Sequence, residues 1–414
     1  MQISTRTFRR FILGRQALWP GRRFSGISGT VQAHAQMEAV QLDPLNIVAR
    51  SHDIAMYGRV LDYRVGFLEE AAYQRREMFD YGGGLFMYPM AEMPAWRPVM
   101  ERQRGSGRWA HIFLEQPGLR EDVLGALRER GPLGNRDFSG NMRVNSYRGR
   151  KDTALALFDL WLTGDIMIHH RRGFDRYYDL LERVLPSVHA HSLAEVESDD
   201  YFARKAVAFL GLVREKRWAG NLTGYTGRKI HPHEASNRIG SYCEQKIFSC
   251  IQVEGSKESW LVLESDLSTM DTLESGNIPL EWQVAGSTTL EEVTFLAPLE
   301  IVSARGRARE VFDFDYVWEV YKPLEQRRWG YYTLPILFGD KLVARLDPRL
   351  DRKNGTLKIL GFWLEDEVSA DDPLFADALR NGLRRFASFL GARAVDVSVV
   401  QPGRLRMHLE GITL

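Results

Sequence analysis

Cysteine is scarce in this sequence, and its spacing excludes two kinds of site. The chain contains only Cys243 and Cys250, with six residues between them. They form neither a CxxC pair for a metal or redox centre nor a disulfide framework, so we expect a reducing compartment. We interpret both as ordinary buried thiols.

Long apolar runs are also missing. Hydrophobic residues make up 44% of the chain, but no run approaches the ~20 residues that a membrane-spanning helix needs. The segment Thr7–Leu13 has the two arginines of a twin-arginine export signal, yet Arg15, Gln16 and Pro20 interrupt the apolar stretch that should follow. We therefore predict a cytoplasmic protein that does not bind membranes.

Neither sign of charge dominates, because 55 Lys and Arg residues balance 54 Asp and Glu residues for a net charge of +1. The chain is not a polycation, but binding to nucleic acid depends on local basic stripes rather than on the total. Residues 1–30 and 141–151 contain no acid. The basic residues there are Arg6, Arg9, Arg10, Arg15, Arg22, Arg23, Arg143, Arg148, Arg150 and Lys151.

Motifs for cofactors and metals are absent as well. No GxSxG, Walker A or dinucleotide-binding pattern occurs, and Gly82–Gly84 lack the spacing of a phosphate loop. His169 and His170 are adjacent on a predicted strand and should point to opposite faces. His231 and His233 have no third ligand nearby. We expect neither a cofactor nor a metal, although a nuclease using His231 and His233 is a weak third hypothesis.

One supersecondary unit is clear between residues 119 and 180. Leu119, Val123, Leu124 and Leu127 form the apolar stripe of a helix that ends before Gly131-Pro132. A short second helix over 132–138 and a periodic third helix over 151–163 follow. Strands over 165–169 and 174–180, joined by a tight link, complete the order helix, helix, helix, hairpin. This order is typical of a winged helix.

Similar units are plausible on both sides. Downstream, we predict helices over 201–214 and 234–250, followed by two strands around residues 254–257. Upstream, we predict helices over 5–13, 30–40 and 60–75 and a strand over 86–88. Residues 285–365 instead show dense aromatics and alternation, with the hairpin signal Asn354-Gly355, and indicate a small antiparallel sheet or barrel. A helix over 372–390 and a strand over 395–400 would close the chain.

The sequence thus predicts an α+β fold of three tandem winged-helix units with a small antiparallel β-barrel and a C-terminal α/β cap. We place a first winged helix at 1–95, a second at 96–190 and a third at 191–284. The barrel and the C-terminal helix occupy 285–414. No coiled coil or exposed apolar helix is evident, so we expect a monomer.

The segment 39–51 carries the best candidate for chemistry. Gln41 and Asp43 flank Leu42, and residues i and i+2 of an extended segment face the same side. An amide and a carboxylate would then converge, with Leu42 anchored in the core. A structural alternative stays open, because Asp43 before Pro44 is also a good helix N-cap.

Several basic residues are candidates for contact with DNA. They lie in the N-terminal arginine cluster, in the predicted wing and in the hairpin near residue 350. These positions suit phosphate contacts, although each residue could simply be a solvated surface charge. The candidates are Arg9, Arg10, Arg22, Arg171, Arg172, Arg349, Arg352 and Lys353. Winged helices alone would be equally compatible with a non-catalytic transcriptional regulator.

The segment VQLDPLNIVARS (40–51) resembles the catalytic motif region of the AlkZ/YcaQ family of DNA glycosylases. The resemblance continues, in the same order, through Ala297–Leu299 and the segments 309–323, 327–337 and 344–359. The family's fold is three winged helices scaffolded by a β-barrel. Gln41-Leu42-Asp43 has the Gln-x-Asp form of the YcaQ branch.

This resemblance implies a monofunctional glycosylase that removes cationic N-alkylated purines, above all N7-alkylguanine, from double-stranded DNA. Asp43 would stabilise the sugar cation and accept a proton from water, and Gln41 would position that water. The hairpin around 347–355 resembles the element that probes the minor groove. Related sequences read W-A-H-E where this chain has Tyr81–Gly84, so unhooking of interstrand crosslinks is less secure than removal of small adducts.

Overall fold

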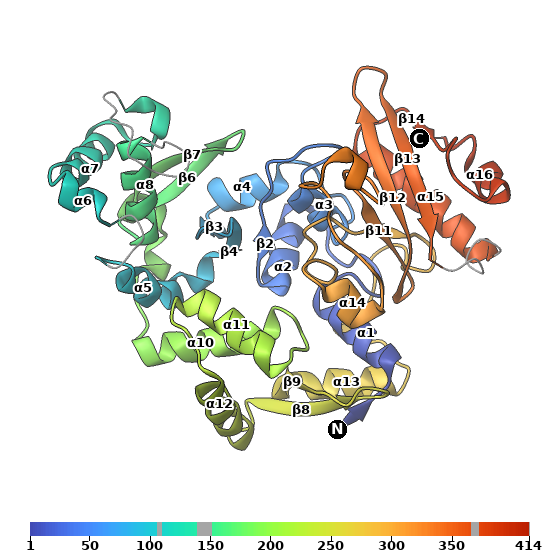
Figure 1. The fold of residues 1–414 in the computed structure, drawn as a ribbon, viewed down its shortest axis with the longest axis horizontal. Coiled ribbons are helices and arrows are strands. Elements are labelled where there is room, and N and C mark those ends of the chain that lie inside the picture. Colours follow the sequence, from blue (N-terminus) through green and yellow to red (C-terminus); the bar gives the residue numbers. More distant parts are fainter. Residues whose placement is uncertain (106–109, 139–150, 366–371, 414) are drawn as a thin grey trace. The chain divides into compact units, whose positions relative to one another are not determined.

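The computed structural model describes residues 1–105, 110–138, 151–365 and 372–413. They form a mixed α/β fold of helices and small sheets (Figure 1). The chain builds two compact units, one from Met1–Leu68, Val207–Trp218 and Pro232–Leu414, the other from Glu69–Ala206 and Ala219–His231. These limits differ from the predicted boundaries at 95, 190 and 284, and the division into winged helices stays a prediction. The basic cluster at 143–150 lies outside the described residues.

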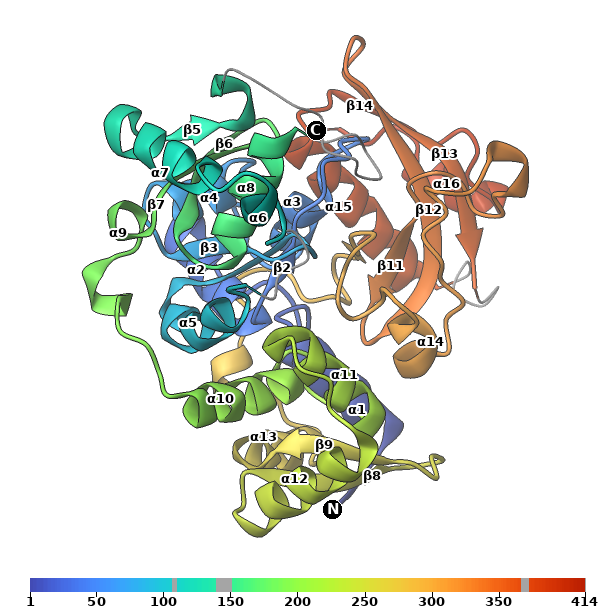
Figure 2. The same ribbon diagram turned by 60° about the vertical axis from the view of Figure 1, so that its left-hand side comes forward.

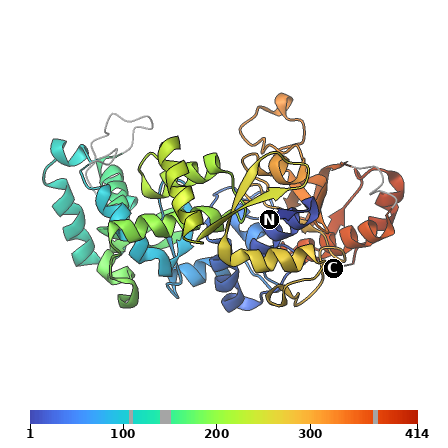
Figure 3. The same cartoon turned by 90° about the horizontal axis from the view of Figure 1, so that it is seen from below.

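The N-terminal helix α1 (Thr5–Arg15) packs into the hydrophobic core of the first unit. Ser4 caps it by accepting a hydrogen bond from the Thr7 N–H, and Phe8, Phe11 and Ile12 are buried. The Phe8 ring meets Trp260 edge to face at 4.8 Å. Trp260 belongs to a sheet of order β1-β8-β9. The N-terminus lies beside this sheet (Figure 3). The elements here are β1 (Gln2–Ile3), α2 (Gly26–Met37), β2 (Val40–Gln41), α3 (Ser51–Tyr57), α12 (Pro232–Glu244), β8 (Phe248–Val253), β9 (Ser259–Leu263) and α13 (Leu267–Glu274).

A five-stranded sheet of order β10-β11-β12-β13-β14 forms the other part of the first unit, with only the β13–β14 pair parallel. Helix α15 covers it through Phe375 and Phe386, whose rings meet Phe338 and Phe295 at 5.4 and 5.0 Å. Asp372 caps α15, and Pro373 fits its first turn. The elements are β10 (Thr294–Phe295), α14 (Arg307–Phe312), β11 (Leu334–Phe338), β12 (Lys341–Asp351), β13 (Thr356–Leu364), α15 (Pro373–Phe389), β14 (Ala394–Asp396) and α16 (Gly403–Leu409).

The second unit contains the sheet β5-β7-β6 and the antiparallel pair of β3 with β4. Figure 2 shows α7 and α8 beside that sheet. Trp161 of α8 is buried and donates its indole N–H to the Asp80 carbonyl at 3.1 Å. The elements are β3 (Met78–Tyr81), β4 (Phe86–Pro89), α5 (Met93–Arg102), α6 (Ile112–Glu115), α7 (Leu119–Arg130), β5 (Leu133–Gly134), α8 (Asp152–Leu162), β6 (Ile166–Arg172), β7 (Asp175–Leu180) and α9 (Leu181–Val184). The chain passes between the units within α4 (Phe67–Tyr73), α10 (Glu195–Ala208) and α11 (Glu215–Thr226). Short 3-10 helices cover Met90–Glu92, Asn135–Asp137, Ser187–His189, Glu264–Asp266, Leu280–Trp282 and Leu324–Gln326.

The prediction of a helix over 60–75 is wrong for most of its length. Residues 58–66 form no helix between α3 and α4. Gly66, the last of them, has φ 102°, a conformation that does not occur within a right-handed helix. The short helix predicted over 132–138 is instead β5 followed by one 3-10 turn. The helix predicted over 234–250 ends at Glu244, because Lys246 turns left-handed at φ 54° before β8. The prediction of two buried thiols is also wrong, because Cys250 is exposed on the solvent side of β8.

Candidate active site

The catalytic motif lies on a short strand and the loop that follows it. Glu38 ends α2 in the left-handed region at φ 67°, and the chain then extends through β2. Val40 and Leu42 are buried, Gln41 is half-buried, and Asp43 is 5% exposed. The predicted anchoring of Leu42 in the core is confirmed.

The structure excludes the helix-cap alternative for Asp43. No helix begins at Pro44, because residues 42–50 form a loop and α3 starts at Ser51 behind its N-cap Arg50. The Asp43 carboxylate instead accepts a hydrogen bond from the Leu45 N–H at 3.1 Å, which is an Asx turn. The Asp43 N–H in turn donates to Nδ1 of His52 at 3.3 Å. His52 therefore fixes the motif backbone from the first turn of α3.

The electrostatics of Asp43 are unusual for a carboxylate on a loop. Its Oδ2 atom is buried and makes no hydrogen bond with any described part of the chain. Burial raises the pKa of the carboxyl above its ordinary value of 3.8, while the Leu45 hydrogen bond acts the other way. The nearby Tyr332 hydroxyl donates elsewhere, to the Ala49 carbonyl at 2.9 Å. Burial and the charge of Asp43 hold the pKa of Tyr332 well above its ordinary value. One carboxylate oxygen is thus left as an acceptor for an incoming group.

Residues of α3 form a second set of contacts around the Gln41–Asp43 motif. The Tyr63 hydroxyl donates to the Asp53 carboxylate at 2.8 Å, and Nε2 of His52 lies 4.0 Å from the same carboxylate. Because Nδ1 of His52 accepts from the motif backbone, a neutral His52 carries its proton on Nε2, toward Asp53. The Ser51 hydroxyl accepts from the Leu299 N–H at 3.2 Å. Sequence spacing alone gave no signal for His52 or Asp53.

The amide of Gln41 has a charged partner that sequence reasoning also missed. Arg305 donates from Nη2 to the Oε1 atom of Gln41. The two residues are 264 positions apart. Arg305 lies just after Ala297–Leu299, one of the segments that carried the family resemblance. Its guanidinium is partly buried, which lowers its pKa.

The hairpin of β12 and β13 contributes Arg352 to the motif loop. The Arg352 guanidinium donates to the carbonyls of Asn46, Ile47 and Val48 at 3.2–3.3 Å and to the Asn46 side chain at 2.9 Å. Arg349 and Lys353 of the same hairpin are exposed. Arg352 is therefore occupied within the protein, whereas its two neighbours present their charges to solvent.

The remaining predicted DNA-contacting residues fall into two groups. Arg22 is 3% exposed and pairs with Glu292, and the Arg171 side chain is 4% exposed and donates to Asp80 at 2.7 Å. Both side chains are held by buried carboxylates, which counts against a phosphate contact, and their contact with DNA stays a prediction. Arg172 is exposed, whereas Arg9 and Arg10 are half-buried. Arg9 donates to the Val311 carbonyl at 3.3 Å, and Arg10 pairs with Asp340 at 2.7 Å.

The histidine pair of β6 corrects another expectation. A register shift between Ile168 and His170 interrupts strict alternation in β6. Nδ1 of His169 and Nδ1 of His170 consequently lie 2.9 Å apart rather than on opposite faces. Within the described ranges, no group of three or more His, Cys, Asp or Glu residues could hold a metal ion.

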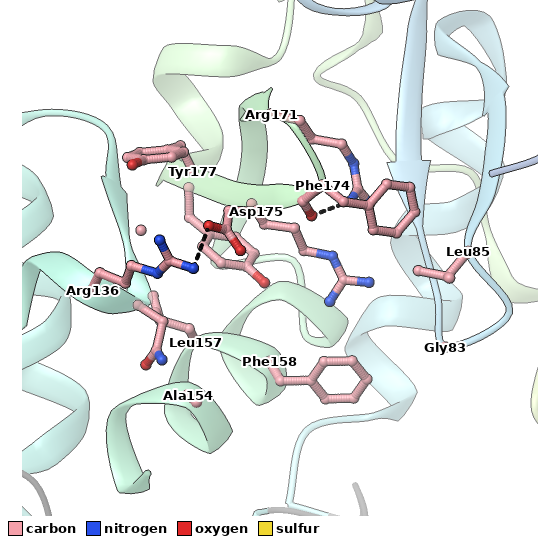
Figure 4. Close-up of a pocket in the computed structure, with 14 residues that line it drawn as sticks. Gly83, Leu85, Arg136, Ala154, Leu157, Phe158, Arg171, Phe174, Asp175 and Tyr177 are labelled. Carbon is pink, nitrogen blue, oxygen red and sulfur yellow. Dashed lines mark hydrogen bonds and ion pairs between the residues drawn. The ribbon is translucent and has the colours of Figure 1, made fainter. Parts of the chain in front are cut away.

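A cavity of about 700 Å³ lies in the second unit, away from the motif residues in sequence (Figure 4). The β3–β4 turn, α8 and the β6–β7 hairpin line it. Its one carboxylate, Asp175, is paired with Arg136 at 3.0 Å, and Arg171 donates to the Phe174 carbonyl at 3.0 Å. Among the described residues that line this cavity, none has a buried acceptor without a partner like Oδ2 of Asp43, so we place the candidate active site at Gln41 and Asp43.

A buried carboxylate with an unpaired oxygen, two positions along the chain from an amide that accepts from Arg305, is an arrangement suited to a hydrolase that activates water. Residues 35–389 match the model of the family described as DNA glycosylase AlkZ-like. The chain therefore belongs to this family and is a DNA glycosylase. Its fold is similar to that of the DNA glycosylase AlkZ of Streptomyces sahachiroi, with a TM-score of 0.57 and 13% sequence identity over 97% of this chain and 100% of that one. No helix in the described ranges is long and apolar enough to cross a membrane.

Proposed function

We propose that this protein hydrolyses the N-glycosidic bond of cationic alkylpurines in double-stranded DNA, above all N7-alkylguanine, and acts as a monomer. The observation that carries this proposal is the buried carboxylate of Asp43 with its unpaired Oδ2. An alkyl group on N7 makes the base cationic, so the base can leave without being protonated. A site with a carboxylate and an amide, but no strong acid, fits such a leaving group.

The reaction balances with these two side chains and one water molecule. The bond between C1′ and N9 breaks, and its electron pair neutralises the departing base. The carboxylate of Asp43 stabilises the positive charge that develops on the sugar. The water oxygen then bonds to C1′, and Asp43 accepts the released proton. The products are the neutral alkylated base and an abasic site in an unbroken strand.

DNA contacts would come from three parts of the chain. We propose that α7, the 3-10 turn at Asn135–Asp137, α8 and the β6–β7 hairpin form a winged helix, with Arg172 on the wing. The β12–β13 hairpin would present Arg349 and Lys353 to the phosphates. Arg9 and Arg10 remain proposed contacts on α1.

The range of lesions depends in part on Gly82–Gly84. Side chains at Gly82 and Gly83 would meet nothing within 4 Å, so this turn is open as well as uncharged. The missing polar side chains remove possible contacts with a base, but they do not alter Asp43. We therefore propose small N7 adducts as the main substrates and crosslinks as a possible extension.

The experiment is a base-release assay on duplexes that carry either N7-methylguanine or an N7 interstrand crosslink, run in parallel. We expect release of 7-methylguanine without strand cleavage and strong loss of release with Gln41→Ala while DNA binding persists. Sequence-selective binding to unmodified operator DNA, without base release, would instead support a transcriptional regulator.

A further inference from the structure

The hydrogen bond between Arg305 and Gln41 decides which way the Gln41 amide faces. A guanidinium carries five N–H donors and no acceptor. Any hydrogen bond that it makes to a glutamine side chain must therefore end on Oε1, as it does here. Oε1 of Gln41 faces the arginine. The Nε2 group, which can only donate, lies on the other branch of the amide.

The fold holds Arg305 at this position with unusual backbone geometry. Arg305 has φ 52° and Gly306 has φ 84°, so two successive residues are left-handed just before α14. A non-glycine residue in this region carries strain of roughly 1 kcal/mol. Such strain persists only where the surroundings enforce it.

The surroundings of Arg305 are anchored through Glu300. Both oxygens of the Glu300 carboxylate accept from Arg59, at 2.7 and 2.8 Å, and the two side chains are 1% and 0% exposed. The hydrogen bond from Leu299 to Ser51 ties the same segment to the start of α3. The segment that carries Arg305 is thus fixed against the helix that also carries His52.

We propose that Arg305 is a positioning residue that orients the Gln41 amide so that Nε2 donates to the oxygen of the attacking water. This inference rests on the proposed hydrolysis. With Nε2 toward the water, Gln41 cannot take a proton from it, and Asp43 is the acceptor. With the amide reversed, Oε1 would accept hydrogen bonds from the same water hydrogens as Asp43.

A direct contact between Arg305 and a DNA phosphate is the competing role, because the Arg305 side chain is exposed. The kinetic test compares Arg305→Met and Arg305→Lys, each alone and combined with Gln41→Ala. Single-turnover excision of 7-methylguanine is measured at saturating enzyme, and DNA affinity is measured separately. Arg349→Met is the matched control for loss of an exposed arginine.

We expect Arg305→Met to slow excision about tenfold with less than about a twofold change in DNA affinity, and Arg305→Lys to recover part of the rate. In the Gln41→Ala background, Arg305→Met should slow excision less than about twofold further, because it acts through the missing amide. Additive losses together with weaker binding, as expected for Arg349→Met, would overturn the proposal.

A second readout needs no substrate. The side-chain amide signals of Gln41 in ¹⁵N NMR spectra, assigned by their loss in Gln41→Ala, should shift in Arg305→Met and shift less in Arg305→Lys. Unmoved signals would overturn the proposed contact. A wild-type protein that releases no base, with the amide shift present, would overturn the proposed function while leaving the orientation of Gln41 by Arg305 supported.

Discussion

At the scale of single residues, Asp43 is placed where stability alone would not favour a carboxylate. Its charge is largely removed from water, and only one oxygen has a hydrogen bond from the protein. An unpaired buried polar atom costs roughly 1–3 kcal/mol. Residues that serve a reaction often carry such a cost, because the reaction needs a group that stability would replace.

Asp43→Asn should therefore leave the fold at least as stable as the wild type at neutral pH, with a gain of about 1 kcal/mol or less. The asparagine removes the buried charge and can still accept from the Leu45 N–H. Urea unfolding at pH 7 measures this difference. A loss of more than about 2 kcal/mol would show that the carboxylate holds the loop together instead.

The pH dependence of excision should follow the ionisation of Asp43. Burial raises the pKa of this group, so the folded protein binds the proton more tightly than the unfolded chain does. Its contribution to stability is most favourable below the unfolded pKa and is lost as the pH rises through the folded pKa. Activity has the opposite dependence, because only the carboxylate can accept a proton.

We expect the single-turnover rate to fall on acidification with a midpoint above the ordinary Asp value of 3.8. Rates across acidic and neutral pH, corrected for spontaneous base loss, give this midpoint. A rate that does not fall as the pH is lowered from neutral through the acidic range would count against Asp43 as the base.

At the scale of elements, the loop that carries the motif depends on the β12–β13 hairpin. Arg352 donates to three successive carbonyls of that loop. We expect Arg352→Met to slow excision about tenfold and to speed amide hydrogen exchange around residues 46–50, because these carbonyls lose their donor. Lys353→Met is the control from the same turn, and it should affect DNA binding only. Equal effects of the two variants on exchange would contradict this role for Arg352.

Elements with clear periodicity or turn signals were predictable from the sequence. The helices α7, α8 and α15 and the strands β6 and β7 lie close to their predicted limits, because each alternates apolar and polar residues at its own period. Helix α3 was missed, since all seven of its residues are buried and no polar face marks it. From the sequence, residues 341–347 indicate a strand that Pro348 would end, yet β12 continues past a register shift to Asp351.

The candidate site was predictable only in part, because some of its contacts come from distant parts of the chain. Gln41 and Asp43 are neighbours in sequence and came with a recognisable segment. Arg305 and Tyr332 reach the motif from distant parts of the chain. No local pattern records such a contact. The buried roles of Arg22 and Arg171 were missed similarly, since their partners Glu292 and Asp80 are 270 and 91 residues away.

At the scale of the whole molecule, a net charge of +1 leaves DNA binding to local groups. Each phosphate contact that is lost should lower the slope of log affinity against log salt by about 0.9. We expect Arg349→Met and Lys353→Met each to do so in salt titrations on undamaged duplex DNA. Arg22→Met should leave the slope unchanged and lower the free energy of unfolding by roughly 3 kcal/mol or less, because the buried Glu292 loses Arg22 but keeps its longer ion pair with Arg385 at 3.6 Å. A reduced slope for Arg22→Met would contradict its structural role.

We propose Asp43 as the base of a water-dependent glycosylase. Single-turnover release of 7-methylguanine from a duplex, compared between the wild type and Asp43→Asn, tests it most directly. We predict a fall of roughly 10²–10⁴-fold with DNA affinity retained. Release at the wild-type rate by Asp43→Asn would contradict the account.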